Sequence, residues 1–371
     1  MMASDSPPMM ASDAPPTTTT MAADTAHHRR CYLCWPHRED TWRDGAGPVR
    51  RAFAEVARAI ATSEDIIILA RPSDAAGARA ALASIGNAEV VPMELDDAWV
   101  RDTGPTFLVD STAGALAAGV DWKFNAWGGA CFTDCARDDA VASVVLARLG
   151  VPRVDGGIVM EGGALHTDGE GTLLVTEECL LCPNRNPALD KAAIERALID
   201  KCGVDKVCWL PFGLHGDTDT NGHVDNVACF AAPATVLLAW EEDPDDPQHE
   251  RSAANLAALE AARDARGRPF RVIKLPQPPP VVRRAEEAAG VAASDDAKAR
   301  LADERLAASY VNAYVGNGVV VAPRFGHADA DAKAAAVLAE AYPGREVVGV
   351  DAREVLLGGG GIHCITLGEP V

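Results

Sequence analysis

The sequence reads GGGGIHCIT over residues 358–366, and the predicted fold and site both depend on this stretch. Four consecutive glycines permit backbone angles that other residues avoid, and they let backbone N–H groups come close to a ligand. Cys364 follows this loop at the start of a short apolar segment. A thiolate at such a place is suited to act as a nucleophile, whereas an inert buried thiol is the alternative and describes most of the other nine cysteines better.

Further towards the N-terminus, HGDTDTNGHVDN at residues 215–226 holds two histidines and three aspartates. His223 and Asp225 are two positions apart, so on an extended chain their side chains face the same side. This pairing favours a histidine proton shuttle beside a carboxylate that binds a cation. A metal site that includes His215 and a solvated acidic loop are the alternatives. A calcium-binding EF-hand loop is excluded, because its twelfth position would be Ala228.

Two shorter motifs supply further carboxylates. WVRDTGP at residues 99–105 places Trp99 near Asp102, and a ring with a carboxylate can grip a planar cation. A surface ion pair between Arg101 and Asp102 is the alternative there. In EGG at residues 161–163, Glu161 ends an apolar run next to two glycines, where a ligand can approach, although an ordinary turn has the same pattern.

These side chains together make up the parts that cleave a guanidinium C–N bond. Two aspartates can hold both sides of the cation while the cysteine attacks its carbon. The histidine can then protonate the departing ammonia and activate water. Because the substrate itself supplies the positive charge, we expect no metal and no cofactor.

The four motifs, in this order, resemble the agmatine deiminase (agmatine iminohydrolase) family. It belongs to the guanidino-group-modifying superfamily, which includes arginine and peptidylarginine deiminases. The resemblance covers residues 28–371. It also includes the segments CWP (34–36), DTWR (40–43), FNAWGG (124–129), TEECLL (176–181), NRNP (184–187) and LAASYVN (306–312).

The resemblance implies an α/β fold, a five-bladed α/β propeller (pentein fold) with fivefold pseudo-symmetry of β-β-α-β units. It implies hydrolysis of agmatine to N-carbamoylputrescine and ammonia through a covalent thiouronium on cysteine, a step in putrescine and polyamine biosynthesis. Matched position by position, it implies these roles: Cys364 as nucleophile, His223 as general acid and base, Glu161 as the third polar catalytic group, Asp102 and Asp225 as guanidinium ligands, Trp99 as a packing surface, Asp219 as partner of the distal amine, and Gly359 as a backbone contact.

Three rival functions stay open at the level of sequence. A deiminase or amidinotransferase acting on arginine or another guanidine shares the same core chemistry. A metal-dependent hydrolase would use His215, His223 and the nearby aspartates. A non-catalytic binding module could have the same fold, although the full set of catalytic residue types argues against it.

The chain as a whole alternates short apolar strands with alanine-rich helices. The pattern predicts helices over residues 49–62, 138–149, 187–201, 249–263 and 328–341, and strands over 66–70, 172–176, 235–240 and 318–323. Pro48 and Pro187 would stand in first helical turns. The proline-rich, then charged stretch 275–305 predicts an excursion from one unit. Residues 1–26 are low in complexity and predict a disordered tail, and residues 27–371 a single catalytic domain.

The amino-acid composition limits the kinds of molecule that the protein can bind. The 371 residues include 34 basic and 54 acidic ones, for a net charge of −20. This charge argues against nucleic-acid binding and favours the approach of a small cation such as agmatine. No apolar run is long enough to cross a bilayer, and the first 26 residues lack a secretory pattern. Ten cysteines without an N-glycosylation sequon predict a cytoplasmic protein with free thiols, and a homo-oligomer is compatible with the sequence.

Overall fold

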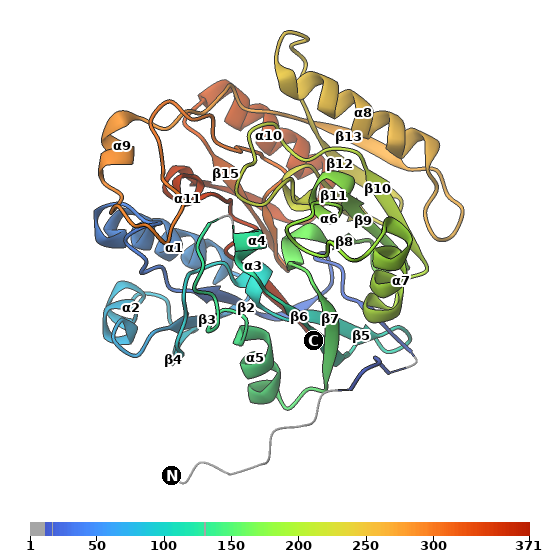
Figure 1. Ribbon diagram of the computed structural model, residues 1–371, viewed down its shortest axis with the longest axis horizontal. Helices are drawn as coiled ribbons and strands as arrows, with labels where there is room; N and C mark the ends of the chain where they lie inside the picture. The colour runs from blue at the N-terminus through green and yellow to red at the C-terminus, as the bar shows by residue number, and fades with distance from the viewer. Residues whose placement is uncertain (1–11, 17, 130) are drawn as a thin grey trace.

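The computed structural model describes residues 12–16, 18–129 and 131–371 (Figure 1). Over these ranges the strands form five sheets, and each sheet contains an antiparallel pair followed by a parallel strand. Parallel neighbours need a crossover connection, which is commonly a helix. The repeated β-β-α-β unit predicted from the sequence is therefore confirmed.

Two of the sheets have four strands. One has the order β17-β2-β3-β4, with bounds Leu367–Pro370, His28–Cys34, Asp65–Ala70 and Ala88–Pro92. The other has the order β1-β5-β6-β7, with bounds Thr19–Met21, Thr106–Asp110, Leu116–Lys123 and Arg153–Val159.

Three sheets have three strands. The first, β10-β9-β8, has bounds Lys206–Leu210, Thr172–Thr176 and His166–Thr167. The second, β11-β12-β13, has bounds Ala228–Ala232, Thr235–Trp240 and Arg271–Pro276. The third, β14-β15-β16, has bounds Tyr314–Val315, Val319–Arg324 and Glu346–Asp351.

Five helices make the crossovers, and Figure 1 shows them on the outside of the molecule, around the strands. They are α1 (Gly47–Ile60), α5 (Val141–Leu149), α7 (Lys191–Cys202), α8 (Pro247–Ala261) and α10 (Ala328–Ala341). The short helices are α2 (Ala75–Ala81), α3 (Val100–Thr103), α4 (Ala126–Gly129), α6 (Glu177–Leu180), α9 (Ala285–Ala289), α11 (Arg353–Gly358), η1 (Asp44–Ala46), η2 (Gly162–Ala164) and η3 (Val224–Asn226). Several of these short helices carry the candidate site.

The five predicted helices and four predicted strands are confirmed to within a few residues, with one clear difference at the start of α7. This helix begins at Lys191 because the Asp190 carboxylate accepts a hydrogen bond from the N–H of Ala193 at 2.8 Å and caps it. Pro187 therefore lies before the helix and not in its first turn. Pro48 does stand in the first turn of α1.

The prediction of a disordered tail over residues 1–26 is wrong for its later part. Strand β1 pairs antiparallel with β5, and Met21 of β1 is buried. Composition could not reveal this strand, because its partner β5 is about ninety residues away in the chain, and without β1 the backbone groups on that side of β5 would be unpaired. Residues 1–11 and 17 of the predicted tail lie outside the described residues.

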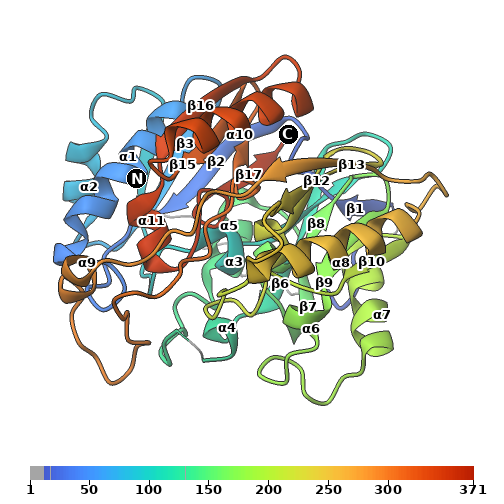
Figure 2. The same ribbon diagram turned by 90° about the horizontal axis from the view of Figure 1, so that it is seen from above.

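The proline-rich stretch 275–305 leaves its sheet after β13 and contains α9, as expected for an excursion. Figures 1 and 2 both show α9 beside α11, and Arg353 of α11 pairs with Glu287 of α9 at 2.6 Å. Within the described ranges, no helix has the length and apolar character that crossing a membrane requires.

Candidate active site

Cys364 lies in the turn between α11 and β17, and its side chain is buried. The preceding glycines are needed for close approach, because a Cβ on Gly360 would lie 2.5 Å from the Trp99 ring and 3.1 Å from the thiol sulfur. The Asn312 amide donates to Cys364 Sγ at 3.2 Å, and the Asp225 carboxylate lies 3.7 Å from the same sulfur. The loop thus presents the sulfur beside a carboxylate.

A cavity of about 330 Å³ opens at this sulfur. Its wall contains three aromatic rings, Trp99, Trp127 and Phe132, together with the carboxylates of Asp102 and Asp219. An aromatic lining that also holds carboxylates suits an organic cation with an apolar stem.

Gly163 marks the point where the other predicted side chains converge. A Cβ added there would lie 2.6 Å from His223 Nδ1, 2.8 Å from Asp102 Oδ1 and 3.0 Å from Asp225 Oδ2. The backbone N–H of Gly163 also donates to Asp102 Oδ1 at 2.9 Å. The glycine is required because any larger residue would push these three groups apart.

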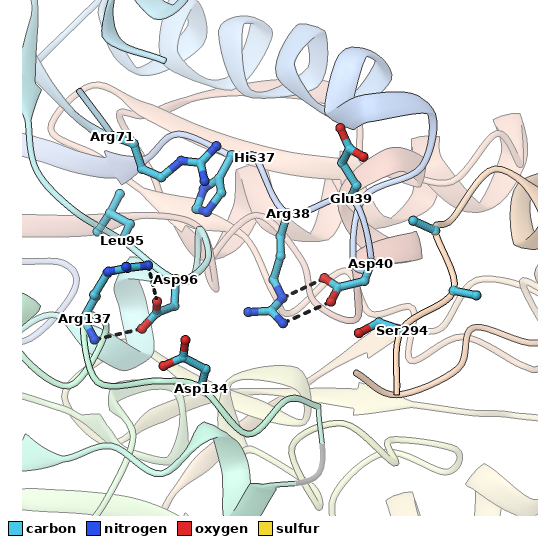
Figure 3. Close-up of a pocket in the computed structure, with 12 residues that line it drawn as sticks. His37, Arg38, Glu39, Asp40, Arg71, Leu95, Asp96, Asp134, Arg137 and Ser294 are labelled. Atoms are coloured by element: carbon cyan, nitrogen blue, oxygen red, sulfur yellow. Dashed lines mark hydrogen bonds and ion pairs between the residues drawn. The ribbon is translucent and has the colours of Figure 1, made fainter. Parts of the chain in front are cut away.

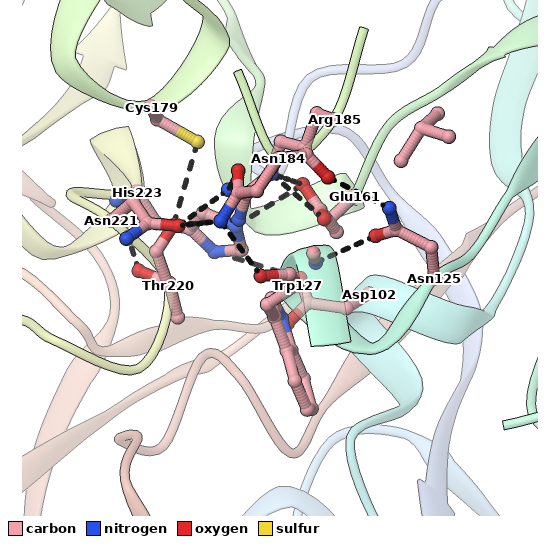
Figure 4. A network of polar contacts seen from close by, with 12 residues as sticks. Asp102, Asn125, Trp127, Glu161, Cys179, Asn184, Arg185, Thr220, Asn221 and His223 are labelled. Atoms are coloured by element: carbon pink, nitrogen blue, oxygen red, sulfur yellow. Dashed lines mark hydrogen bonds and ion pairs between the residues drawn. The ribbon is translucent and has the colours of Figure 1, made fainter. Parts of the chain in front are cut away.

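The imidazole of His223 lies between two carboxylates (Figure 4). Its Nδ1 is 3.8 Å from Asp102 Oδ1, and its Nε2 is 3.5 Å from Glu161 Oε2. Both ring nitrogens are buried and have no hydrogen-bond partner among the described residues. Burial by itself would lower the pKa of His223, but Asp102 and Glu161 raise it well above its ordinary value. A protonated histidine is therefore available as a general acid.

Arg185 is a residue to which the sequence analysis gave no role. Its Nε donates to both oxygens of Glu161 at 3.0 Å, and both side chains are buried. Although burial raises the pKa of Glu161, the charge of Arg185 lowers it below the ordinary value. The NRNP motif was the available signal, but local sequence does not show which carboxylate the arginine meets.

One carboxylate oxygen of Asp225 accepts a hydrogen bond, and the other has no donor among the described residues. His363 Nδ1 donates to its Oδ2 at 2.8 Å, whereas Oδ1 is buried and has no partner among the described residues. Burial raises the pKa of Asp225, but His363 lowers it below the ordinary value. A buried, ionised oxygen without a donor can receive one from a ligand.

The thiol of Cys364 is held in its neutral form. Burial raises its pKa well above the ordinary value, and the negative charges of Asp225 and Asp102 raise it further. A cation bound between these carboxylates would reverse their effect on the sulfur. Nucleophile activation is therefore coupled to the charge of whatever enters the cavity.

Three further predicted residues, Trp99, Asp219 and Gly359, line the same cavity. Trp99 stacks on Trp42 with ring centroids 5.1 Å apart, and Gly359 has a φ of 116°, which favours glycine. The carboxylate of Asp219 already pairs with Arg300 at 2.8 Å and Lys298 at 2.8 Å. Asp219 is thus placed for contact with a substrate, but two cations share it.

A wider cleft of about 950 Å³ lies beside this site (Figure 3). Four of its charged side chains are paired: Arg38 with Asp40 at 2.7 Å and Arg137 with Asp96 at 3.3 Å. The residues that line it include no cysteine. The nucleophile belongs to the narrower cavity.

Two groups of side chains in the described part of the chain have the spacing of metal ligands. One contains Asp24, His166 and His363, and the other contains Glu161, Cys179 and His223. Neither group includes His215, whose backbone N–H bonds Gln248. The described residues therefore do not assemble the rival metal site of His215 and His223.

Comparison with known proteins agrees with this geometry. Residues 20–370 match the family model described as Porphyromonas-type peptidyl-arginine deiminase. The chain belongs to this family. This member of the Porphyromonas-type deiminase family is 46% identical over 360 residues to the agmatine deiminase of Medicago truncatula, covering 94% of the chain and 96% of that protein. It is 48% identical over 354 residues to the agmatine deiminase of Stutzerimonas stutzeri, covering 94% and 95%.

The solved structures of the family share the fold of this member. A structure of the agmatine deiminase of Enterococcus faecalis superposes with a TM-score of 0.92 at 36% identity, and the match covers 96% of this chain and 98% of that one. The fold is mixed α/β and is shared with this agmatine deiminase structure.

Proposed function

We propose that the protein hydrolyses agmatine to N-carbamoylputrescine and ammonia, and so contributes to putrescine and polyamine synthesis. The observation that carries this proposal is the cluster of a buried thiol, a histidine and three carboxylates within a few ångströms of one another, at a cavity that Cys364 and Asp102 line. The relatives of nearly full length named agmatine deiminase support the same substrate.

In the first half of the reaction, the guanidinium binds between Asp102 and Asp225, and its charge favours loss of the Cys364 proton to solvent. The thiolate attacks the guanidinium carbon and forms a C–S bond. His223, protonated beside Glu161, gives its proton to one terminal nitrogen. That C–N bond breaks, ammonia leaves, and a thiouronium remains on the cysteine.

In the second half, neutral His223 takes a proton from a water molecule that attacks the thiouronium carbon. The C–S bond then breaks, the remaining hydroxyl proton passes to the departing sulfur so that Cys364 regains its thiol, and the product keeps the new C–O bond as a neutral urea. The nitrogen lost as ammonia is replaced by the oxygen of water. This half needs only the histidine and the cation-binding carboxylates, because the electron pair of the broken bond returns to sulfur.

Specificity for agmatine would arise at the far end of the cavity, where Asp219 could accept the distal ammonium. Arg300 lies there too, but its guanidinium already donates to Asp219 and to the backbone oxygen of Gly358 at 2.7 Å. A ligand with an α-carboxylate, such as arginine, would bring its negative charge towards Asp219. We therefore expect agmatine to be preferred over arginine.

We also propose that the five sheets are the blades of a five-bladed α/β propeller with fivefold pseudo-symmetry. The repeated order of antiparallel pair, crossover helix and parallel strand supports this arrangement. Residues 27–371 would form one catalytic domain, which β1 extends towards the N-terminus. The cytoplasmic location and the homo-oligomer stay predictions.

A panel of guanidines tests the proposal. The purified protein should release ammonia from agmatine, with a product of the mass of N-carbamoylputrescine, and little from arginine. Comparable turnover of both compounds would contradict the assignment. The variant Cys364→Ala should lose turnover and still bind agmatine in calorimetry, and unchanged turnover would remove Cys364 from the mechanism.

A further inference from the structure

Asp24 follows β1 in the N-terminal segment and reaches the rear of the candidate site. Its carboxylate lies 2.9 Å from His363 Nε2, 3.1 Å from His166 Nε2 and 3.1 Å from Arg101 Nη1. These three partners come from the nucleophile turn, β8 and α3. One carboxylate thus joins three parts of the chain, and two of them, α3 and the nucleophile turn, also line the cavity.

His363 lies between two carboxylates. Its Nδ1 meets Asp225 Oδ2 at 2.8 Å, and its Nε2 meets Asp24 Oδ2 at 2.9 Å. Ionised carboxylates only accept hydrogen bonds, so both ring nitrogens must donate and the ring must be an imidazolium. Burial and Arg101 lower the pKa of His363, but Asp24 and Asp225 outweigh them and raise it.

His166 has a defined role in this cluster. The backbone N–H of Phe230 donates to His166 Nδ1 at 3.2 Å, so this nitrogen is an acceptor and the ring proton sits on Nε2. His166 therefore donates to Asp24 as a neutral imidazole. The single negative charge of Asp24 is left to balance Arg101 and the imidazolium of His363.

The hydrogen bond from His363 fixes the orientation of the Asp225 carboxylate. Because His363 holds Oδ2, the other oxygen, Oδ1, stays free of donors from the described residues and is buried. The occupied oxygen is the one 3.7 Å from Cys364 Sγ. A fixed carboxylate of this kind is preorganised, so it need not reorient when the cation binds.

We propose that Asp24 and His363 are positioning residues that hold Asp225 ionised and oriented towards the guanidinium. The inference rests on the proposed function, because it assigns these residues a task in that reaction. It gives the N-terminal segment a part in the chemistry, in addition to its packing on β5. A role limited to anchoring the N-terminal segment is the competing explanation.

The variant Asp24→Asn separates the two explanations. The charged and titratable groups that face His363 are Asp24, His166, Arg101, Asp225 and the adjacent Cys364. Loss of the Asp24 charge removes one of the two carboxylates that keep the imidazolium protonated, so His363 should lose its proton at lower pH. We expect kcat/KM for agmatine to fall about tenfold to a hundredfold at neutral pH, as for other groups that orient a catalytic ligand. In a plot of kcat/KM against pH, the alkaline limb should move to lower pH.

Two further variants complete the test. Asp24→Glu keeps the charge and should restore most of the rate and the position of the alkaline limb. Met21→Ala, in β1, loosens the same segment and removes none of the hydrogen bonds of Asp24; it should lower the melting temperature and leave the alkaline limb in place. Two outcomes would show that Asp24 only anchors the N-terminal segment and would overturn the inference. One is an alkaline limb that moves as far in Met21→Ala as in Asp24→Asn. The other is a kcat/KM for Asp24→Glu as low as that of Asp24→Asn.

His363→Asn tests the link from the other side if Asp24→Asn does not fold. The asparagine amide can still donate to Asp225 but carries no charge and is too short to reach Asp24. We expect a similar loss of kcat/KM with an unchanged circular dichroism spectrum, and a wild-type rate would overturn the inference. An inactive wild-type protein would refute the proposed function and the inference with it, whereas an active one with an unaltered Asp24→Asn profile would refute the inference alone.

Discussion

Replacing Arg185 by methionine tests how the site tolerates its buried charges. The guanidinium donates to both oxygens of Glu161 at 3.0 Å, to the side-chain oxygens of Asn184 at 3.0 Å and Asn221 at 2.7 Å, and to the backbone oxygen of Thr220 at 2.7 Å. Methionine fills a similar volume and makes none of these bonds. Glu161, fully buried, would lose its guanidinium partner and keep only His223, whose Nε2 lies 3.5 Å from Oε2.

The expected loss in free energy of unfolding follows from the burial of Arg185 and Glu161. Removing one partner of a buried ion pair destabilises a protein by about 3–5 kcal/mol, because the other charge stays desolvated. The cost should depend on pH in a definite direction. In the wild type the pKa of Glu161 lies below its ordinary value, so this group adds stability above the unfolded pKa of about 4.5, and that stability is lost as the pH falls through the folded pKa. The difference between wild type and Arg185→Met should therefore be largest near pH 7 and shrink towards pH 4.

Urea unfolding, followed by circular dichroism at both pH values, measures this difference. Arg251→Met is a matched control, since Arg251 and Glu178 form a half-exposed pair that should contribute no more than about 1 kcal/mol. The double variant Arg185→Met with Glu161→Gln should be less destabilised than the sum of the two single changes. A cost below about 1 kcal/mol at pH 7, or one that does not vary with pH, would refute the reasoning.

Three other outcomes can be checked with the same protein. Gly163→Ala should lower agmatine turnover at least about a hundredfold, because its Cβ would lie 2.6 Å from His223 Nδ1. Gly77→Ala is the control, since a Cβ there meets nothing within 4 Å and turnover should stay unchanged. Equal turnover in the two variants would contradict the predicted crowding. Alkylation of Cys364 by iodoacetamide, read by mass spectrometry, should stay slow at pH 7 and rise only above the ordinary thiol pKa; full reactivity at pH 6 would show that the carboxylates do not hold the thiol neutral. Asp219→Asn should raise KM for agmatine about tenfold or more with little change in kcat, as expected for loss of a charge-assisted contact, and an unaltered KM would remove Asp219 from substrate binding.

The predicted site residues came from short motifs, and the structure places five of them in the lining of one cavity and the other three beside Asp102 and Cys364. Cys364, Asp225, His223 and Asp102 lie within a few ångströms of shared neighbours, although they come from three separate segments. Their residue types could be predicted from the sequence because cleavage of a guanidinium C–N bond needs a nucleophile, a general acid and carboxylates that bind the cation. Their roles await the experiments above.

Other members of the site could not be inferred from local pattern. Asp24 stood in a segment whose composition predicts disorder, and Arg185 stood in a motif with no assigned partner. Both are defined by contacts across long stretches of chain, such as the bond between Asp24 and His363, which are 339 positions apart. Asp219 shows the same limit, since its sequence suggests a free carboxylate and its neighbours Lys298 and Arg300 appear only in the fold.

The sequence by itself determined the five crossover helices and one central strand in each of four sheets, because hydrophobic period and capping act over a few residues. It also determined the kinds of side chain that the chemistry uses. The tertiary structure alone decided which charges meet. Pairings such as Arg185 with Glu161, and His363 between Asp24 and Asp225, set the protonation states of the site. These states depend on burial and on distances of about 3 Å between segments, and neither quantity is present until the chain has folded.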